Sequence, residues 1–500
     1  MRSLRRIAAG LGVGLVVGAG LGWAQAPGGT PAVPQAGARP TGPAQAGAPG
    51  GALAGVPGGH NGGVGAAVPA EKPATDFTAK QNEARLAAWR EQIRKILYVP
   101  DKLPALEAKT WSTFSPTPGM LADRVTYHTM DGMLVTAIVY RPDPKAAHRN
   151  GNGNGNGKGK LPGILMVNGH GSDKFGWYAM YTGMEYAKAG AVVVTYDMIG
   201  EGERNIDKKS RASSHDKRVT PPDGVPATDW GQRVAGLMQV DLMQGVTYLS
   251  EQPEVDAKRI AVLGYSMGSF VTGIAGAIDT RIHAVVLSGG GVFDGPGGYF
   301  DAGQLPCQGP PYRALQVIGD RSAILYALNA QRGAMYIMNG SVDTVMDIPH
   351  HLQPWFDEVK ARAIAVRGSD KDMFTTVFYP GASHRPSWEN RDATEWLEQN
   401  IHFGIWTEKQ IEAMPTVKVS EWAKQNNVTA GTSEMREERE GGVDALDVRL
   451  PNIKREDLMV LPDADWQAMK DQLTYEAWAA KAAAAEAAMA AATHTGSTGN

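Results

Sequence analysis

Short runs of uniformly apolar residues alternate with amphipathic segments through the middle of the chain. Runs that are hydrophobic throughout are typical of parallel strands buried on both faces, and apolar residues recurring every three or four positions predict helices. Alternating strands and helices predict an α/β fold with a mainly parallel sheet. The expected strands are residues 161–167, 191–196, 259–264, 284–288, 334–338 and 375–379, and the expected helices are 181–189, 228–250 and 269–278.

Other elements are predicted on both sides of this region. Residues 81–97 have the apolar spacing of a helix, and residues 124–129 and 134–140 flank Asp131-Gly132, which is a hairpin signal. Farther on, residues 408–426 have helical character, and the alanine-rich run 479–492 favours a helix without an apolar stripe. We therefore expect a catalytic domain at 74–405 and a partly helical C-terminal extension at 406–500.

The N-terminus has the composition of a targeting segment. Basic residues are followed by an apolar stretch and by Ala24-Gln25-Ala26, which together predict a cleaved signal peptide at 1–26 and an exported protein. A retained membrane anchor is the alternative, but the many glycines of the stretch weaken it as a spanning helix, so we expect no stable membrane insertion after cleavage. Residues 27–73 are mostly Gly, Ala and Pro and predict a disordered linker.

Composition and charge argue against a nucleic-acid partner, a disulfide and a bound metal or cofactor. The formal net charge of −3 over 500 residues gives no electrostatic footprint for nucleic acid. The one cysteine, Cys307, excludes an intramolecular disulfide, and its loop-like context predicts a structural residue. We find neither a zinc-type spacing of His and Cys nor a glycine-rich phosphate loop, and therefore expect no metal and no organic cofactor.

The pentapeptide Gly264-Tyr265-Ser266-Met267-Gly268 lies between a predicted strand and a predicted helix. This context is what a G-x-S-x-G nucleophile elbow requires, because the glycines permit the sharp turn that exposes the serine hydroxyl. The turn also places Ser266 at a helix N-terminus, where free N–H groups favour negative charge. Ser266 is thus the candidate nucleophile.

A serine nucleophile needs a base, and the base needs an orienting acid. His384 lies in a Gly/Pro loop directly after the last predicted strand, and Asp343 follows the strand at 334–338. The order Ser266, Asp343, His384 is that of α/β-hydrolases. Asp347 is the second candidate for the acid, ahead of Asp370 and Asp372; a surface histidine and a capping aspartate are the non-catalytic alternatives.

The loop after the strand at 161–167 is expected to complete the site. A tetrahedral oxyanion needs hydrogen-bond donors, and we assign them to the backbone N–H groups of Met267 and Ser172. Gly171, Trp177 and Tyr265 are the expected substrate contacts, and His170 is expected to shape the loop. Residues 203–229 and 289–320 are candidate lid or rim insertions.

At these positions the chain resembles the α/β-hydrolase superfamily over about residues 120–405, and especially secreted esterases related to acetyl xylan esterases and dienelactone hydrolase-like proteins. The matching motifs are Asp131-Gly132, Gly169-His170-Gly171, Asp197-x-x-Gly200-x-Gly202, Asn339-Gly340-x-x-Asp343 and Gly381-Ala382-Ser383-His384. The resemblance implies an α/β-hydrolase three-layer sandwich and a serine esterase acting on a small-molecule or carbohydrate ester. A prolyl-oligopeptidase-like peptidase and a non-catalytic binding protein remain the alternatives.

Overall fold

The computed structural model describes residues 71–147, 159–210, 215, 227–294, 299–303, 305–384, 386–418, 444–446 and 453–496. The predicted signal peptide at 1–26 and residues 27–70 of the predicted linker lie outside the described residues. Among the helices of the described part, none is both long and apolar enough to cross a membrane.

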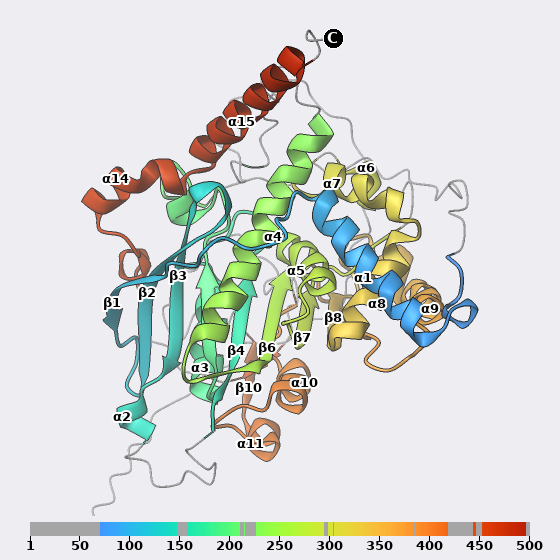
Figure 1. Ribbon diagram of the computed structural model, residues 1–500. Helices are drawn as coiled ribbons and strands as arrows, with labels where there is room; N and C mark the ends of the chain where they lie inside the picture. Colours follow the sequence, from blue (N-terminus) through green and yellow to red (C-terminus); the bar gives the residue numbers. More distant parts are fainter. Residues whose placement is uncertain are drawn as a thin grey trace, which may run out of the picture. The chain divides into compact units, whose positions relative to one another are not determined.

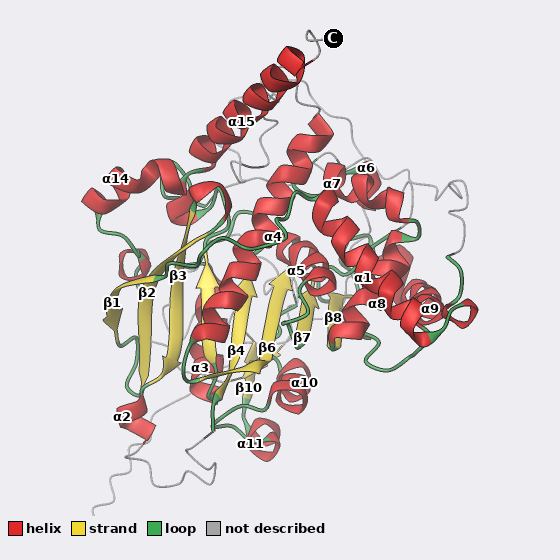
Figure 2. Ribbon diagram, in the orientation of Figure 1, coloured by secondary structure: helices red, strands yellow, loops and turns green. Residues whose placement is uncertain are grey.

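One nine-stranded sheet is the centre of the described structure (Figures 1 and 2). Its spatial order is β1-β2-β3-β5-β4-β6-β7-β8-β9; the first three strands and β5 pair antiparallel, and the strands from β5 to β9 run parallel. The strands are β1 (Lys109–Phe114), β2 (Met120–His128), β3 (Leu134–Pro142), β4 (Leu161–Val167), β5 (Val192–Tyr196), β6 (Val255–Tyr265), β7 (Ala284–Ser288), β8 (Ala334–Gly340) and β9 (Thr375–Tyr379).

Helices cover both faces of this sheet. Helices α1, α4, α5, α8 and α9 contribute to one buried apolar cluster, whereas α3, α10, α11 and α14 contribute to the cluster on the other face. The longer helices are α1 (Ala79–Ile96), α3 (Trp177–Ala189), α4 (Ala227–Glu251), α5 (Met267–Ile278), α8 (Arg321–Arg332), α9 (Ile348–Arg367), α10 (Arg391–Ile401), α14 (Asp463–Leu473) and α15 (Tyr475–Gly496), and the short ones are α2 (Pro144–Ala147), α6 (Tyr299–Ala302), α7 (Gly309–Ala314) and α11 (Glu408–Ala413).

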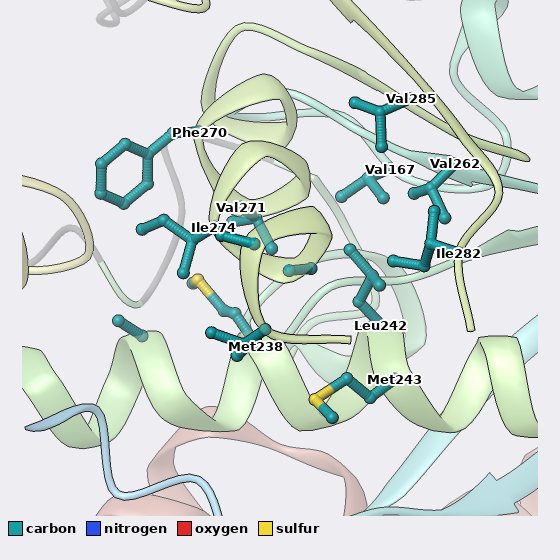
Figure 3. Close-up of a cluster of buried hydrophobic side chains, with 14 of the residues drawn as sticks. Val167, Met238, Leu242, Met243, Val262, Phe270, Val271, Ile274, Ile282 and Val285 are labelled. Atoms are coloured by element: carbon teal, nitrogen blue, oxygen red, sulfur yellow. The ribbon is translucent and has the colours of Figure 1, made fainter. Parts of the chain in front are cut away.

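The alternation of side chains along each central strand explains why both faces are apolar. Val262 of β6 belongs to the cluster under α4 and α5, and the next residue, Leu263, belongs to the cluster on the opposite face. Figure 3 shows Leu242 of α4 and Val271 of α5 in the same cluster of buried side chains as Val262. The three layers expected from the sequence are therefore observed.

One predicted helix ends earlier than expected. The helix predicted at 408–426 is only α11, which ends at Ala413 and is followed by the short strand β10 (Thr416–Lys418), paired with β11 (Asp444–Leu446). Pro415 has no N–H to donate and disfavours a helical residue before it, which explains the early end. Residues 419–426 lie outside the described part.

The C-terminal extension packs against the rest of the fold. The side chain of Trp478, at the start of α15, is fully buried, and its ring centroid lies 5.2 Å from that of Trp230 in α4. Its Nε1–H donates a hydrogen bond of 2.9 Å to Oδ2 of Asp131. The helix is therefore held by its first turn, which lies just before the alanine-rich run at 479–492.

Candidate active site

Ser266 occupies the turn between β6 and α5 with φ 53° and ψ −121°. A positive φ is costly for a residue with a Cβ, by roughly 1–3 kcal/mol, and persists only where the surroundings impose it. The flanking glycines are required by close approach, since a Cβ on Gly264 would lie 2.2 Å from the Gly268 carbonyl oxygen and one on Gly268 would lie 2.3 Å from that of Val167. The turn therefore has the strained geometry of a nucleophile elbow.

The hydroxyl of Ser266 lies within hydrogen-bond distance of an imidazole. Its Oγ is 2.7 Å from Nε2 of His384, and Nδ1 of His384 is 3.0 Å from Oδ2 of Asp343. Because a carboxylate only accepts, Nδ1 carries the proton and Nε2 is free to accept the serine hydroxyl. The three residues thus form a continuous hydrogen-bonded chain.

Asp343 is held by its own backbone turn. Its other oxygen, Oδ1, accepts hydrogen bonds from the N–H groups of Val345 at 2.9 Å and Met346 at 3.1 Å, and the side chain is fully buried. The second candidate, Asp347, is partly exposed and hydrogen-bonds to Nδ1 of His350. The structure therefore brings Asp343 to His384, whereas Asp347 contacts another histidine.

The side chain of Asn339 joins two loops of the site, although no role at the site was predicted for it. Asn339, near the end of β8, accepts a hydrogen bond of 2.9 Å from the N–H of Gly290 and donates one of 3.1 Å to the carbonyl of the same residue. The neighbouring Gly289 lies against His384, because a Cβ there would approach the His384 carbonyl oxygen to 2.0 Å. The Asn339-Gly340 pair in the sequence motif was the available signal for this role.

The loop after β4 lies beside the elbow. A Cβ on Gly169 would lie 3.1 Å from Cβ of Ser266. In this loop the N–H of Gly171 donates to Oε1 of Glu201 at 3.0 Å, and the N–H of Ser172 is 3.4 Å from the carbonyl of Gly169, which is long for a hydrogen bond. Met267 is the first residue of α5, so its N–H has no acceptor within the helix.

The three residues expected to contact substrate lie in different surroundings. Tyr265 is fully buried, and its ring packs 4.5 Å from that of Tyr178 and 5.9 Å from that of Trp388, measured between centroids. It supports the elbow from within the core, and its contact with substrate stays a prediction. Gly171 shapes the loop through its bond to Glu201. Trp177 begins α3, and its side chain lies outside the described part.

Three buried charges lie between the loops that follow β4 and β5. Nζ of Lys174 is 2.8 Å from Oε2 of Glu203 and also pairs with Asp197, and all three side chains are at most 3% exposed. Although burial opposes the charge, the two carboxylates hold the pKa of Lys174 above its usual value. We call Lys174, Asp197 and Glu203 the buried charge cluster.

The C-terminal segment, residues 453–482, completes this cluster. The N–H groups of Val460 and Leu461 donate to the Glu203 carboxylate at 2.8 and 2.9 Å, and Nε1–H of Trp466 donates to its backbone carbonyl at 2.8 Å. Arg455 pairs with Asp173 in the loop after β4. Although burial raises the pKa of Asp173, Arg455 and Lys174 hold it below its ordinary value. Residues of the C-terminal segment, more than 250 positions away in the chain, therefore fix the conformation of the loops after β4 and β5.

The structure also brings together residues of metal-ligand type, which the sequence analysis did not expect. Ligand atoms of His170, His215 and Cys307 lie within 4.8 Å of one another. The absence of a zinc-like spacing along the chain did not exclude a cluster formed from three separate loops.

Comparison with known proteins agrees with the fold. The sequence profile of the prolyl oligopeptidase family matches residues 174–407, just under half of the chain. A thiohydrolase of Arthrinium phaeospermum is 24% identical over 168 residues, which are 33% of this chain and only 42% of that protein.

Similar solved structures include an acetyl xylan esterase from a Paenibacillus species, with 14% identity and a TM-score of 0.41 over 63% of this chain and 94% of that chain. A glucuronoyl esterase from Solibacter usitatus has 16% identity and a TM-score of 0.43 over 62% and 90% of the two chains. The sheet, its flanking helices and the family match confirm the resemblance predicted from the sequence: the chain has the α/β-hydrolase fold.

Proposed function

We propose that the protein is a serine hydrolase that cleaves carboxylic esters through an acyl-enzyme intermediate. The family match supports a hydrolase of the prolyl-oligopeptidase or esterase type. The observation that carries the proposal is the hydrogen-bonded chain from Ser266 through His384 to Asp343, built on a strained elbow. In this proposal Ser266 is the nucleophile, His384 the base and Asp343 the orienting acid.

In the first half of the reaction, Oγ of Ser266 attacks the ester carbonyl carbon. Nε2 of His384 takes the hydroxyl proton, and Asp343 stabilises the resulting imidazolium while remaining ionised. The backbone N–H of Met267 and a second N–H from the loop after β4, assigned to Ser172, stabilise the oxyanion. Collapse of the tetrahedral intermediate breaks the bond to the leaving alcohol, which receives the proton from His384.

In the second half, water replaces the alcohol. His384 removes a proton from the water as it attacks the acyl-enzyme, and returns a proton to Ser266 as the acid leaves. The two half-reactions consume one water per ester, leave the enzyme unchanged and require no group beyond the residues described. Esters of small molecules and carbohydrates are the proposed substrate class, with acetylated xylan as the first carbohydrate to test.

The test is hydrolysis of p-nitrophenyl esters of increasing acyl length by the wild-type protein and by Ser266→Ala. We expect kcat/KM to fall at least about 10⁴-fold in the variant, since removing a triad nucleophile leaves only binding and oxyanion stabilisation. Ser115→Ala, in the loop before β2, is the matched control and should retain the wild-type rate. A Ser266→Ala protein that is folded and equally active would refute the proposal.

A peptidase of the prolyl-oligopeptidase type is the second candidate, favoured by the family match alone. Short peptides with proline before a chromogenic amide separate the two activities, because both use Ser266 but differ in the leaving group. Faster turnover of these amides than of any ester, abolished by Ser266→Ala, would replace the esterase assignment with a peptidase one.

We further propose that the protein is exported after removal of residues 1–26. The basic residues, apolar stretch and Ala24-Gln25-Ala26 support this proposal. N-terminal sequencing of the protein recovered from expressing bacteria tests it, and a mature chain that begins at residue 27 is the expected result. An intact N-terminus in the membrane fraction would instead indicate a retained anchor.

A further inference from the structure

His170, His215 and Cys307 come from three separate parts of the chain. His170 belongs to the loop after β4, and the other two lie in the stretches 203–229 and 289–320 that the sequence marked as rim insertions. Nε2 of His170 lies 3.2 Å from Sγ of Cys307, and the rings of His170 and His215 are 5.7 Å apart between centroids. His215 and Cys307 are almost completely buried, whereas His170 is half-buried.

The hydrogen bond of His215 fixes the tautomer of its ring. Its Nδ1 is 2.7 Å from the backbone carbonyl oxygen of Ile199. A carbonyl oxygen only accepts, so Nδ1 carries the proton and, in the neutral ring, Nε2 keeps its lone pair. A ring N–H donated to a backbone carbonyl is the usual outer-sphere arrangement of a metal-binding histidine, because it fixes both the tautomer and the ring orientation.

We propose that His170, His215 and Cys307 form a binding site for a zinc-type transition metal ion beside the active site. Two imidazoles and a thiolate are the donor set that Zn²⁺ prefers over Mg²⁺ or Ca²⁺. Metal binding replaces the thiol proton of Cys307, so one proton is released for each ion bound.

The ligand atoms need to move only slightly closer together to bind one zinc ion. Zn–N bonds of 2.0–2.1 Å and Zn–S bonds of 2.3 Å put tetrahedral ligand atoms about 3.3–3.8 Å apart. The His170–Cys307 pair is already close to that range at 3.2 Å, and the widest separation in the group is below 4.8 Å. The residues lie outside the central strands, so a shift of about 1 Å does not disturb the sheet.

The surrounding charge also suits a bound cation. A divalent ion with one thiolate and two neutral imidazoles carries a net charge of +1. Glu201 is completely buried and accepts a hydrogen bond from the N–H of Gly171, the residue directly after His170. When ionised, this carboxylate would offset part of the remaining positive charge and make burial of the ion less costly.

The position of the site suggests what the ion does. The residue before His170, Gly169, lies against Ser266, so the same loop contacts the elbow and supplies a ligand. A bound ion therefore joins His215 and Cys307 to the loop that we assign to the oxyanion hole. With three described ligands, one tetrahedral position remains for water. We expect the ion to hold His170, His215 and Cys307 together, and hydrolysis to follow the mechanism given above without a step at the metal.

The direct test is titration of the reduced, metal-free full-length protein with Co²⁺, followed by absorption spectroscopy. Since Cys307 is the only cysteine of the chain, a thiolate-to-cobalt charge-transfer band in the near ultraviolet identifies it as a ligand. We expect this band to saturate at one Co²⁺ per chain and to disappear when Zn²⁺ is added. This measurement does not depend on any variant folding, nor on whether the protein is an esterase.

Variants then test two of the ligands separately. Zn²⁺ affinity measured in competition with a chromogenic chelator should fall at least about tenfold in Cys307→Ser and in His215→Gln, as expected when a ligand is lost. His128→Gln, on the surface at the end of β2, is the matched control and should bind as the wild type does. Circular dichroism establishes that each variant is folded.

Two results would overturn the proposal. One is the absence of a charge-transfer band in folded, reduced wild-type protein at saturating Co²⁺, which would mean that His170 and Cys307 form only a polar contact. The other is stoichiometric Zn²⁺ binding that is unchanged in folded Cys307→Ser and His215→Gln, which would place the ion elsewhere. Neither result affects the serine hydrolase proposal, which Ser266→Ala tests separately.

Discussion

The hydrogen-bonded chain at Ser266 and the buried charge cluster use similar parts for different purposes. In both, a carboxylate from a loop after a parallel strand accepts backbone N–H groups and one side-chain donor. At the elbow the donor is His384, whose second nitrogen remains available to Ser266. In the buried charge cluster the donor is Lys174, whose ammonium is held by two carboxylates. The first arrangement can pass a proton on, and the second holds its charges in place.

This comparison teaches that burial alone does not identify a reactive site. Asp343 and Glu203 are equally inaccessible to solvent and each accepts two backbone N–H groups. They differ in what lies beyond the partner: a serine hydroxyl in one case and a second carboxylate in the other. Substitution of each acid should therefore affect activity in one region and stability in the other.

The largest effect is expected from Asp343→Asn. The amide can no longer hold the imidazole in the productive tautomer or stabilise the imidazolium, so kcat/KM for an activated ester should fall about 10⁴-fold. The unfolding midpoint in urea should change little, because the amide oxygen can still accept the N–H groups of Val345 and Met346. Asp347→Asn is the matched control; an equal loss of activity in that variant alone would identify Asp347 as the acid.

The next effect is expected from Glu203→Gln. Removing one carboxylate from a buried ion pair typically costs about 3–5 kcal/mol of stability. The single amide oxygen of glutamine cannot accept hydrogen bonds from Lys174 and from both N–H groups of the C-terminal segment. The free energy of unfolding measured in urea should fall by that amount, while kcat/KM of the folded protein should fall less than about tenfold. Asp463→Asn, which breaks an exposed pair with Lys208, should leave stability unchanged. A stable but inactive Glu203→Gln would assign the cluster to the reaction instead.

A smaller, pH-dependent effect is expected at Glu389, which follows the His384 loop. Burial raises its pKa from 4.5 to about 7, so the folded state holds the proton more tightly than the unfolded state. Its contribution to stability is therefore complete below about pH 4.5 and is lost as the pH rises to about 7, by up to about 3 kcal/mol. Burial also raises the pKa of Glu185, which adds to the same slope.

Urea unfolding between pH 4.5 and 7 measures this effect. In Glu389→Gln the loss of stability over that interval should be smaller than in the wild type, because the amide does not ionise. Glu83→Gln, at an exposed position of α1, should keep the wild-type slope. An unchanged slope in Glu389→Gln would mean that Glu389 is ionised in the folded protein.

The elbow and its partners could be predicted from the sequence because each has a local signal. Apolar runs locate the strands, glycines permit the turn, and the chain order of Ser266, Asp343 and His384 distinguishes this fold from other serine hydrolases. The surroundings of Tyr265 could not be predicted in the same way. It adjoins the nucleophile in sequence, yet successive side chains of a strand point to opposite faces, and its ring lies in the core.

The alternating strands and helices, the elbow and the order of its partners follow from the sequence alone, because these features depend on hydrophobic spacing and on local backbone requirements. The contacts between residues from distant parts of the chain depend instead on how the layers pack. Glu203 meets Val460 and Leu461, and His170 meets Cys307, with no local pattern to announce either contact. Buried charges and polar atoms need hydrogen-bond or ion-pair partners. These partners come from segments that lie nearby only once the layers have packed.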